Sequence, residues 1–261
     1  SPSTVVINNI EFDHADIFND LNDIKRQFHH LIKIIPSSGN IIYFHEDENI
    51  NDVLSMGHWC NLAAINSEDI QINFQSRELI NKGKLHVLGE LPLIGEHNFK
   101  NYVSAILAAN LNGIEIEDSI MALKSFNGVI RRLEYKGSFS DVLIYDDFAH
   151  HPTAITFSSN AIRDQYPDKR ILGLIELGSN TMSDGSHRRS LPDSANALDK
   201  VIWLDHNKIL SEGKNVKSAS DIDSFIEIAK LESSNHDIIL LVTNKDSQKI
   251  LRPLINHLEK K

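Results

Sequence analysis

The sequence contains few of the residues that define several protein classes. Its 261 residues include a single cysteine, Cys60, which excludes a disulfide scaffold and predicts a reduced, cytoplasmic compartment. Only 12 residues are glycine, so collagen-like and glycine-rich low-complexity classes are excluded. No apolar run reaches the roughly 18 residues of a membrane span, and the N-terminus lacks a signal-peptide pattern. We therefore expect no membrane association.

Positive charge is also scarce, because 26 Lys and Arg residues face 36 Asp and Glu residues, a formal charge of −10. Such an acidic surface repels phosphate backbones, so no nucleic-acid partner is expected. A chain of this length provides about two domains at roughly 150 residues each. Nothing in the composition selects an oligomeric state.

Three glycine-containing motifs are absent as well. The Gly-Lys pairs at Gly83 and Gly213 are followed by Leu85 and Asn215, so neither completes a Gly-x-x-x-x-Gly-Lys-Ser/Thr phosphate loop. The Rossmann glycine fingerprint and the Gly-x-Ser-x-Gly nucleophile elbow do not occur either. The chain therefore carries no phosphate loop of its own and no serine-hydrolase signature.

What the sequence does contain is an alternation of strand and helix patterns. In the first half, a strand at Thr4–Asn8, a helix at Phe12–Ile35 and a strand at Ile41–Phe44 predict a parallel unit. Alternating segments predict antiparallel strands at Ile70–Phe74 and Leu85–Leu88. Helices are then predicted over 99–111 and 117–126, with a domain boundary near Gly128.

The second half repeats this alternation and predicts a doubly wound, Rossmann-like sheet. The predicted strands are Leu133–Tyr135, Val142–Tyr145, Ile171–Ile175, Lys200–Leu204 and Ile238–Val242. The predicted helices are Thr153–Gln165, Leu191–Ala197, Ile222–Lys230 and Ser247–Leu258.

Titratable residues gather directly after the first strand, in the segment Asn8–Asp16. Carboxylates and an imidazole at the carboxyl end of a strand could hold Mg²⁺. Alternatively, Asp13 or Asp16 could cap the following helix by accepting backbone N–H groups.

A second cluster, Gly95–Asn101, opens the helix predicted at Phe99. Asn98 and Asn101 are three residues apart, so their amides share one helical face and could contact a purine. Asn98 acting as the helix N-cap is the alternative.

The pair Arg131-Arg132 at the domain boundary forms a third cluster. An arginine there could bind a phosphate through its planar guanidinium, or the pair could be ordinary surface charge.

The fourth cluster is Asp146–Thr153, where two carboxylates and two imidazoles follow a strand and precede a proline suited to a first helical turn. Such groups could orient a ribose, position a nucleophile or bind a metal. Adjacent histidines tend to point apart, which disfavours zinc.

In this order the four clusters resemble the Mur ligase family of ATP-dependent enzymes that form amide bonds. The resemblance covers the chain to about residue 182. It implies an α/β fold in which residues 1–128 are the C-terminal part of a central ATPase-type domain and residues 129–261 are a C-terminal Rossmann-like domain. The family's N-terminal UDP-binding domain and its phosphate loop have no counterpart, so we expect the chain alone not to turn over ATP.

The segments Glu11–Phe18, Gln27–Leu31 and Ser179–Met182 favour the tripeptide-adding members of the family. The implied reaction joins UDP-N-acetylmuramate to L-alanyl-γ-D-glutamyl-meso-diaminopimelate during peptidoglycan recycling, through an acyl phosphate. A ligase that adds L-alanine to UDP-N-acetylmuramate is the first alternative. A non-catalytic nucleotide- or peptide-binding module is the second, and a metal hydrolase using the histidine pairs is the last.

The resemblance also implies residue roles. His14 would ligate Mg²⁺, Arg132 would contact the γ-phosphate of ATP, and Asp147 would contact the ribose. His150 and His151 would shape the acyl-phosphate or amine site. The remaining assignments are His97, Asn98 and Asn101 for the adenosine, and Asn9, Ser179, Asn180 and Thr181 for the substrates. Replacing Arg132 or Asp147 by alanine is expected to remove activity and leave stability nearly unchanged.

Two segments depart from the family pattern. Leu177-Gly178 stands where the tripeptide-adding member has an arginine before Ser-Asn-Thr-Met. Thr243–Asp246 replaces a glycine-rich turn after the last strand. Both segments are expected to face the peptide, so they bear on which acceptor the enzyme selects.

Overall fold

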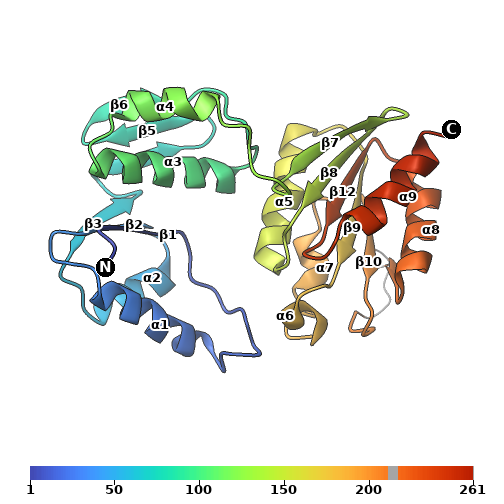
Figure 1. Cartoon of the computed structure of the whole chain (residues 1–261), viewed down its shortest axis with the longest axis horizontal. Coiled ribbons are helices and arrows are strands. Elements are labelled where there is room, and N and C mark those ends of the chain that lie inside the picture. Colours follow the sequence, from blue (N-terminus) through green and yellow to red (C-terminus); the bar gives the residue numbers. More distant parts are fainter. Residues whose placement is uncertain (211–216, 261) are drawn as a thin grey trace. The chain divides into compact units, whose positions relative to one another are not determined.

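The computed structural model describes residues 1–210 and 217–260, in two compact units (Figure 1). Unit 1 comprises Ser1–Pro92 and Glu96–Asn127, and unit 2 comprises Leu93–Gly95 and Gly128–Lys261. The Gly213-Lys214 pair lies outside the described residues. Within the described ranges, no helix combines the length and the apolar character needed to cross a membrane.

Unit 1 is built on a three-stranded parallel sheet in the order β1-β2-β3. Its strands are β1 (Thr4–Ile7), β2 (Asn40–Phe44) and β3 (Asn61–Ile65), and its crossover helices are α1 (Leu21–Lys33) and α2 (Glu48–Ser55). Isoleucines of α1, α2 and the strands share one buried core. The predicted strand–helix–strand unit is therefore confirmed, whereas β3 and α2 were not predicted.

The first helix is shorter than predicted, because α1 begins at Leu21 and not at Phe12. Asp20 is its N-cap and accepts a hydrogen bond from the backbone N–H of Asp23. The residues before it form turns, and His14 has a positive φ of 56°, which is incompatible with a right-handed helix. The alternative in which Asp13 or Asp16 caps this helix is therefore wrong.

Unit 1 also contains a small antiparallel sheet and two helices. The sheet has the order β4-β5-β6, and β5 pairs with both neighbours, so the predicted outer strands are joined by a strand that was not predicted. Its strands are β4 (Ile70–Asn73), β5 (Glu78–Asn81) and β6 (Lys84–Val87), and the helices are α3 (Glu96–Leu111) and α4 (Ile116–Lys124). Helix α3 contacts β1 and β2 of the parallel sheet.

Unit 2 contains a six-stranded sheet in the order β11-β10-β9-β12-β8-β7. All pairs are parallel except β7 with β8, which follow each other through a tight turn. The strands are β7 (Glu134–Phe139), β8 (Val142–Asp147), β9 (Ile171–Glu176), β10 (Lys200–Leu204), β11 (Lys217–Ala219) and β12 (Ile238–Val242). The mixed α/β fold with parallel strands is as predicted, and β11 is an addition.

Helices cover both faces of this sheet (Figure 1), and each face has its own apolar core. The helices are α5 (Pro152–Gln165), α6 (Asn180–Ser183), α7 (Leu191–Ser194), α8 (Ile222–Ser233) and α9 (Gln248–Leu258). Side chains of α5 and α7 pack into one core, and those of α8 and α9 pack into the other. The carboxyl ends of β8, β9, β10 and β12 meet along one edge, where open α/β sheets bind ligands.

Candidate functional site

In unit 1, the carboxyl end of β1 contacts the first turns of α3. The side-chain amide of Asn8 donates to Asn101 Oδ1 at 2.9 Å, and Ser104 Oγ donates to Asn8 Oδ1 at 3.3 Å. This bridge brings together the first two clusters of the sequence, which are more than ninety residues apart. One of their members, Asn101, keeps an exposed side chain beside this bridge.

The predicted adenosine residues differ in accessibility. Because α3 begins at Glu96, Asn98 lies inside the first turn, so the alternative in which it is the N-cap is wrong. Asn98 is 6% exposed, whereas His97 is half-buried and Asn101 is exposed. The two asparagines therefore lie at different depths on the helix.

The predicted metal ligand His14 stands on a turn beside acidic groups. Its imidazole Nε2 is 3.9 Å from Asp13 Oδ2, and its side chain is 65% exposed. Asp13 Oδ1 also accepts from the His14 backbone N–H at 2.7 Å, and the side chain of Asn9 donates to Glu11 Oε1 at 2.6 Å.

No group of three or more His, Cys, Asp and Glu side chains suited to a metal occurs in the described part of the chain. A fully protein-ligated metal site is therefore not formed at His14. Mg²⁺ does not require one, since it commonly takes one or two protein ligands and completes its octahedron with water and phosphate oxygens. The neighbourhood of His14 fits this second arrangement.

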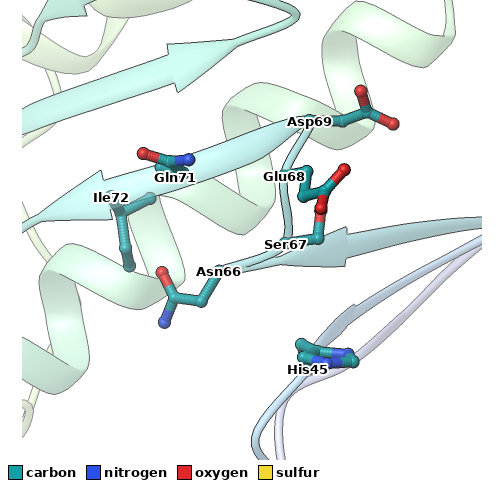
Figure 2. A pocket seen from close by; sticks show the side chains of 7 residues that line it. All are labelled: His45, Asn66, Ser67, Glu68, Asp69, Gln71 and Ile72. Carbon is teal, nitrogen blue, oxygen red and sulfur yellow. The ribbon is translucent and has the colours of Figure 1, made fainter.

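A hollow of about 760 Å³ lies at the carboxyl ends of β2 and β3. Figure 2 shows its lining along the loop from β3 to β4 and on β4 itself, with His45 set apart at the end of β2. The lining residues are His45, Asn66, Ser67, Glu68, Asp69, Gln71 and Ile72. None of the catalytic or binding residues predicted from the sequence lines this hollow, so we do not include it in the candidate site.

In unit 2, the carboxylate of Asp147 at the end of β8 is held by three donors. The backbone N–H groups of Leu133 and Ala149 donate at 2.7 and 2.8 Å, and Ser158 Oγ donates at 3.1 Å. The residue is 3% exposed. Burial raises the pKa of Asp147, although these three donors and the charge of Arg132 oppose that shift. Asp147 thus holds the backbone just before β7, at Leu133, and just after β8, at Ala149.

The two arginines of the third cluster occupy different environments. Arg131 is largely internal, since it donates to the carbonyl of Thr243 and lies 3.5 Å from Asp146 Oδ1. Arg132 is exposed, and its guanidinium carbon is 5.9 Å from the centre of the Phe148 ring. Arg132 is therefore the arginine whose charge is available to a phosphate.

The neighbouring carboxylate, Asp146, is also internal. Burial raises its pKa, and the hydrogen bond from Ser247 at 2.6 Å and the charge of Arg131 oppose that shift. Ser247 directly precedes α9, so Asp146 ties the end of β8 to the segment after β12. Of the adjacent pair, neither carboxylate is exposed to solvent.

The two predicted histidines lie at the start of α5. The Nδ1 atom of His150 is 2.9 Å from the carbonyl oxygen of Phe148, and Ser179 Oγ donates to the His150 carbonyl at 3.2 Å. His151 is the N-cap, and its Nδ1 accepts from the Thr153 N–H at 3.3 Å. A capping imidazole was not expected from the sequence, but the predicted proline at the first helical turn is confirmed.

The histidine His187 was missed by the sequence reasoning. Its ring lies 4.6 Å from that of His151, edge to face. No local motif surrounds His187, so only the tertiary fold shows that it belongs to this region. Arg131 and Ser158 were likewise missed as partners of the two aspartates.

The predicted peptide-binding segment follows β9 and opens the short helix α6. Ser179 is its N-cap and accepts from the Met182 N–H at 3.3 Å. Asn180 is exposed and Ser179 is half-buried, whereas Thr181 is 3% exposed. Unit 2 therefore brings Arg132, Asp147, His150, His151 and the exposed part of this segment together at one edge of its sheet.

Family models match both parts of the chain. The Mur ligase middle domain matches residues 1–109, and the Mur ligase glutamate ligase domain matches residues 131–244. The chain belongs to the Mur ligase family. The resemblance read from its four clusters is thereby confirmed.

Two curated Mur ligases illustrate the similarity. The UDP-N-acetylmuramate–L-alanyl-γ-D-glutamyl-meso-2,6-diaminoheptandioate ligase of Escherichia coli strain K12 is 35% identical over 100% of this chain and 60% of its own length. The UDP-N-acetylmuramate–L-alanine ligase of Acetivibrio thermocellus is 28% identical over 95% of this chain and 59% of its own length. Both relatives are named as ligases.

Among solved Mur ligase structures, a murein peptide ligase from Psychrobacter arcticus 273-4 matches with a TM-score of 0.72 and 30% identity. The match covers 100% of this chain and 58% of that one. The chain thus spans about three fifths of the length of the Mur ligases that it matches.

Proposed function

We propose that this chain forms the ATP- and peptide-handling part of a ligase that joins UDP-N-acetylmuramate to L-alanyl-γ-D-glutamyl-meso-diaminopimelate. The observation that carries the proposal is the match of the whole chain, at 35% identity, to a ligase named for that tripeptide. The alanine-adding relative matches at 28% and remains the second candidate. In this proposal, residues 1–128 belong to the central domain, residues 129–261 form the C-terminal domain, and the enzyme works in the cytoplasm.

The proposed reaction has two steps. The lactyl carboxylate of UDP-N-acetylmuramate attacks the γ-phosphorus of ATP, the bond to the β-phosphate oxygen breaks, and ADP leaves. The L-alanyl amine of the tripeptide then attacks the carbonyl carbon of the acyl phosphate. The carbon–oxygen bond breaks, inorganic phosphate leaves, and the amine loses a proton. Catalysis of such transfers rests mainly on positioning and charge stabilisation.

In unit 2, Arg132 is proposed to stabilise the charge of the transferred phosphoryl group. Its exposed guanidinium lies against Phe148, which limits its motion without neutralising its charge. Asp147 is proposed to support nucleotide binding at the ribose and to hold the backbone at Leu133, next to Arg132. His150 and His151 are proposed to shape the place where the amine meets the acyl phosphate.

In unit 1, His14 is proposed to hold Mg²⁺ together with water and the phosphate oxygens of the substrate. The bound ion would supply charge neutralisation to the phosphates. His97, Asn98 and Asn101 are proposed to contact the adenosine, and Asn9 the uridine-linked substrate. Ser179, Asn180 and Thr181 are proposed to form the peptide side of the site, with Thr181 acting from its buried position.

The test uses the product of the complete coding sequence that contains this chain. The purified protein is incubated with ATP, Mg²⁺ and UDP-N-acetylmuramate, and with the tripeptide, L-alanine or no acceptor. Products are measured by mass spectrometry and ADP by a coupled assay. We expect ADP and a ligated product with the tripeptide at a kcat/KM at least tenfold above that with L-alanine.

Preference for L-alanine would establish the second candidate instead. Absence of ADP formation with every acceptor, from a folded protein, would refute the ligase proposal and favour a binding module. The polypeptide of residues 1–261 alone is expected to form no ADP, because no phosphate loop occurs in it.

A further inference from the structure

A lysine lies across a glycine where β9 and β12 end. A Cβ atom built on Gly178 would be 3.1 Å from Lys245 Cγ and 3.3 Å from Lys245 Cε, and 2.3 Å from Asn244 Oδ1. Two carbons along the lysine stem thus approach the same open face of the glycine. A side chain at position 178 would collide with Asn244 Oδ1 and crowd the stem of Lys245, so the glycine leaves the space in which both side chains lie.

The backbone that carries Lys245 is anchored in the sheet. The Lys245 N–H donates to Thr243 Oγ1 at 2.9 Å, and Thr243 Oγ1 donates in turn to Glu176 Oε2. Thr243 is fully buried and Glu176 is 8% exposed. Lys245 therefore starts from a rigid point that links the last residue of β9 to the end of β12.

The charge of Lys245 is not neutralised by the protein. The residue is exposed, and its ammonium has no ion-pair partner in the described ranges 1–210 and 217–260. The nearby buried carboxylates are engaged elsewhere, Glu176 by Thr243 and Asp146 by Arg131 and Ser247. In a chain with a net charge of −10, a fixed lysine without a partner at the ligand edge of a sheet is suited to an external anion.

We propose that Lys245, held over Gly178, binds a carboxylate of the acceptor peptide and thereby determines acceptor specificity. The inference rests on the proposed function and adds a residue to the peptide side of that site. Lys245 lies over the residue that precedes Ser179 and Asn180, which are proposed to contact the peptide. A tripeptide containing glutamate and diaminopimelate offers several carboxylates, whereas L-alanine offers one.

The test compares Lys245→Met with Lys249→Met in the product of the complete coding sequence. Lys249 is an exposed lysine on α9 and serves as the matched control. We expect Lys245→Met to raise the KM for the tripeptide about tenfold, the effect of losing one charge-assisted hydrogen bond, with kcat and the KM for ATP within twofold of the wild type. Lys249→Met should match the wild type in all three constants.

Each carboxylate of the tripeptide is then replaced in turn by an amide. One monoamide should raise the wild-type KM about tenfold and leave the KM of Lys245→Met unchanged, because the pair is already broken. Lys245→Arg should restore tight binding of the unmodified tripeptide, because it restores the positive charge. A purely structural role for Lys245 would not depend on the charge of the acceptor.

An unchanged tripeptide KM in Lys245→Met, or equal losses with the acid and every monoamide, would overturn this inference while the ligase proposal stands. Binding of the tripeptide is also measured by calorimetry, which requires no turnover. If the wild type neither ligates nor binds the tripeptide, the proposed function fails and the role of Lys245 fails with it.

Discussion

Replacing Asp147 by alanine should destabilise unit 2 as well as remove activity. The family resemblance alone implied a loss of activity with little change in stability. The structure changes that expectation, because the carboxylate is 3% exposed and accepts hydrogen bonds from Leu133, Ala149 and Ser158. Alanine would leave the backbone N–H groups of Leu133 and Ala149 without this acceptor, whereas the Ser158 hydroxyl could still donate to the Ala154 carbonyl at 3.1 Å.

The magnitude follows from these three donors. Hydrogen bonds to a charged group contribute about 1.5–3 kcal/mol each, and a buried donor left without a partner costs about 1–3 kcal/mol. The burial that raises the pKa of Asp147 acts in the opposite direction, since removing the carboxylate also removes its desolvation cost. We therefore expect the free energy of unfolding of unit 2 to fall by about 2–4 kcal/mol.

Urea unfolding followed by tryptophan fluorescence measures this loss. Trp203 in unit 2 is 1% exposed, whereas the other tryptophan, Trp59 in unit 1, is 50% exposed. A large change in emission on unfolding therefore reports mainly on unit 2. The matched control is Asp164→Ala, at an exposed position of α5, for which a change within about 0.5 kcal/mol is expected.

Ser158→Ala provides an internal calibration, because it removes one donor and leaves Asp147 with the other two. Its expected cost is about 1 kcal/mol. If Asp147→Ala loses less than about 1 kcal/mol in a cooperative transition, the assignment of Asp147 as an anchor of this backbone is wrong.

Three further predictions concern single side chains. Arg132→Ala should reduce kcat at least a hundredfold and leave the urea midpoint unchanged, because the guanidinium is exposed and its carbon lies 5.9 Å from the centre of the Phe148 ring; near-normal turnover would contradict its phosphate role. His14→Ala should raise the Mg²⁺ concentration for half-maximal activity, and an unchanged Mg²⁺ titration would contradict the metal role. The pKa of Asp199 lies below its ordinary value of 3.8. Burial alone would raise this pKa, but the hydrogen bond from the Ile171 N–H and the charge and hydrogen bond of Arg163 lower it by more. The stability that Asp199 contributes is therefore fully present above about pH 4 and is lost as pH falls through its folded-state pKa, so Asp199→Asn should flatten the acid limb of stability measured by urea unfolding at pH 3 to 6.

Strands could be predicted from the sequence where a run of apolar residues coincides with a strand that is buried in the fold. The predicted bounds of β10 and β12 match the structure to the residue, and every residue of β12 is buried. A continuous run of apolar residues bounded by polar ones is stable as a central strand of a parallel sheet, because both faces of such a strand are buried. The three-residue edge strand β11 has no such pattern, since it owes its existence to pairing with β10.

Helix boundaries were less predictable because several residues carry the same local signal. Asp13, Asp16 and Asp20 are all suitable N-caps, and apolar residues at helical spacing continue on both sides of them. The choice of Asp20 depends on the turn around His14, whose backbone is left-handed. A hydrophobic period does not reveal such a turn.

The types of residue in the candidate site were predictable, but their partners were not. The Asp147 carboxylate meets Leu133 and Ser158, which are 14 and 11 residues away in sequence. These contacts arise because β7, β8 and α5 pack together, and no spacing rule encodes them. For this reason the family resemblance implied a ribose contact for Asp147, while nothing in the sequence indicated its role in holding the backbone.

The different environments of Arg131 and Arg132 depend on the backbone that the Asp147 carboxylate holds. Arg131 and Leu133 both have positive φ, at 57° and 47°, a conformation that non-glycine residues adopt at a cost of about 1 kcal/mol or more each. Hydrogen bonds hold this turn, among them those from Leu133 N–H to Asp147, from Phe148 N–H to the Arg131 carbonyl at 2.8 Å and from Arg131 N–H to Glu134 Oε2 at 3.0 Å. With the turn held, Arg131 reaches the interior at Asp146 and Arg132 stays exposed, and their guanidinium carbons lie 4.9 and 5.9 Å from the centre of the Phe148 ring. In the proposed function, the buried Asp147 carboxylate thus holds the backbone from which Arg132 presents its charge to a phosphate, so loss of either residue should reduce ligase activity.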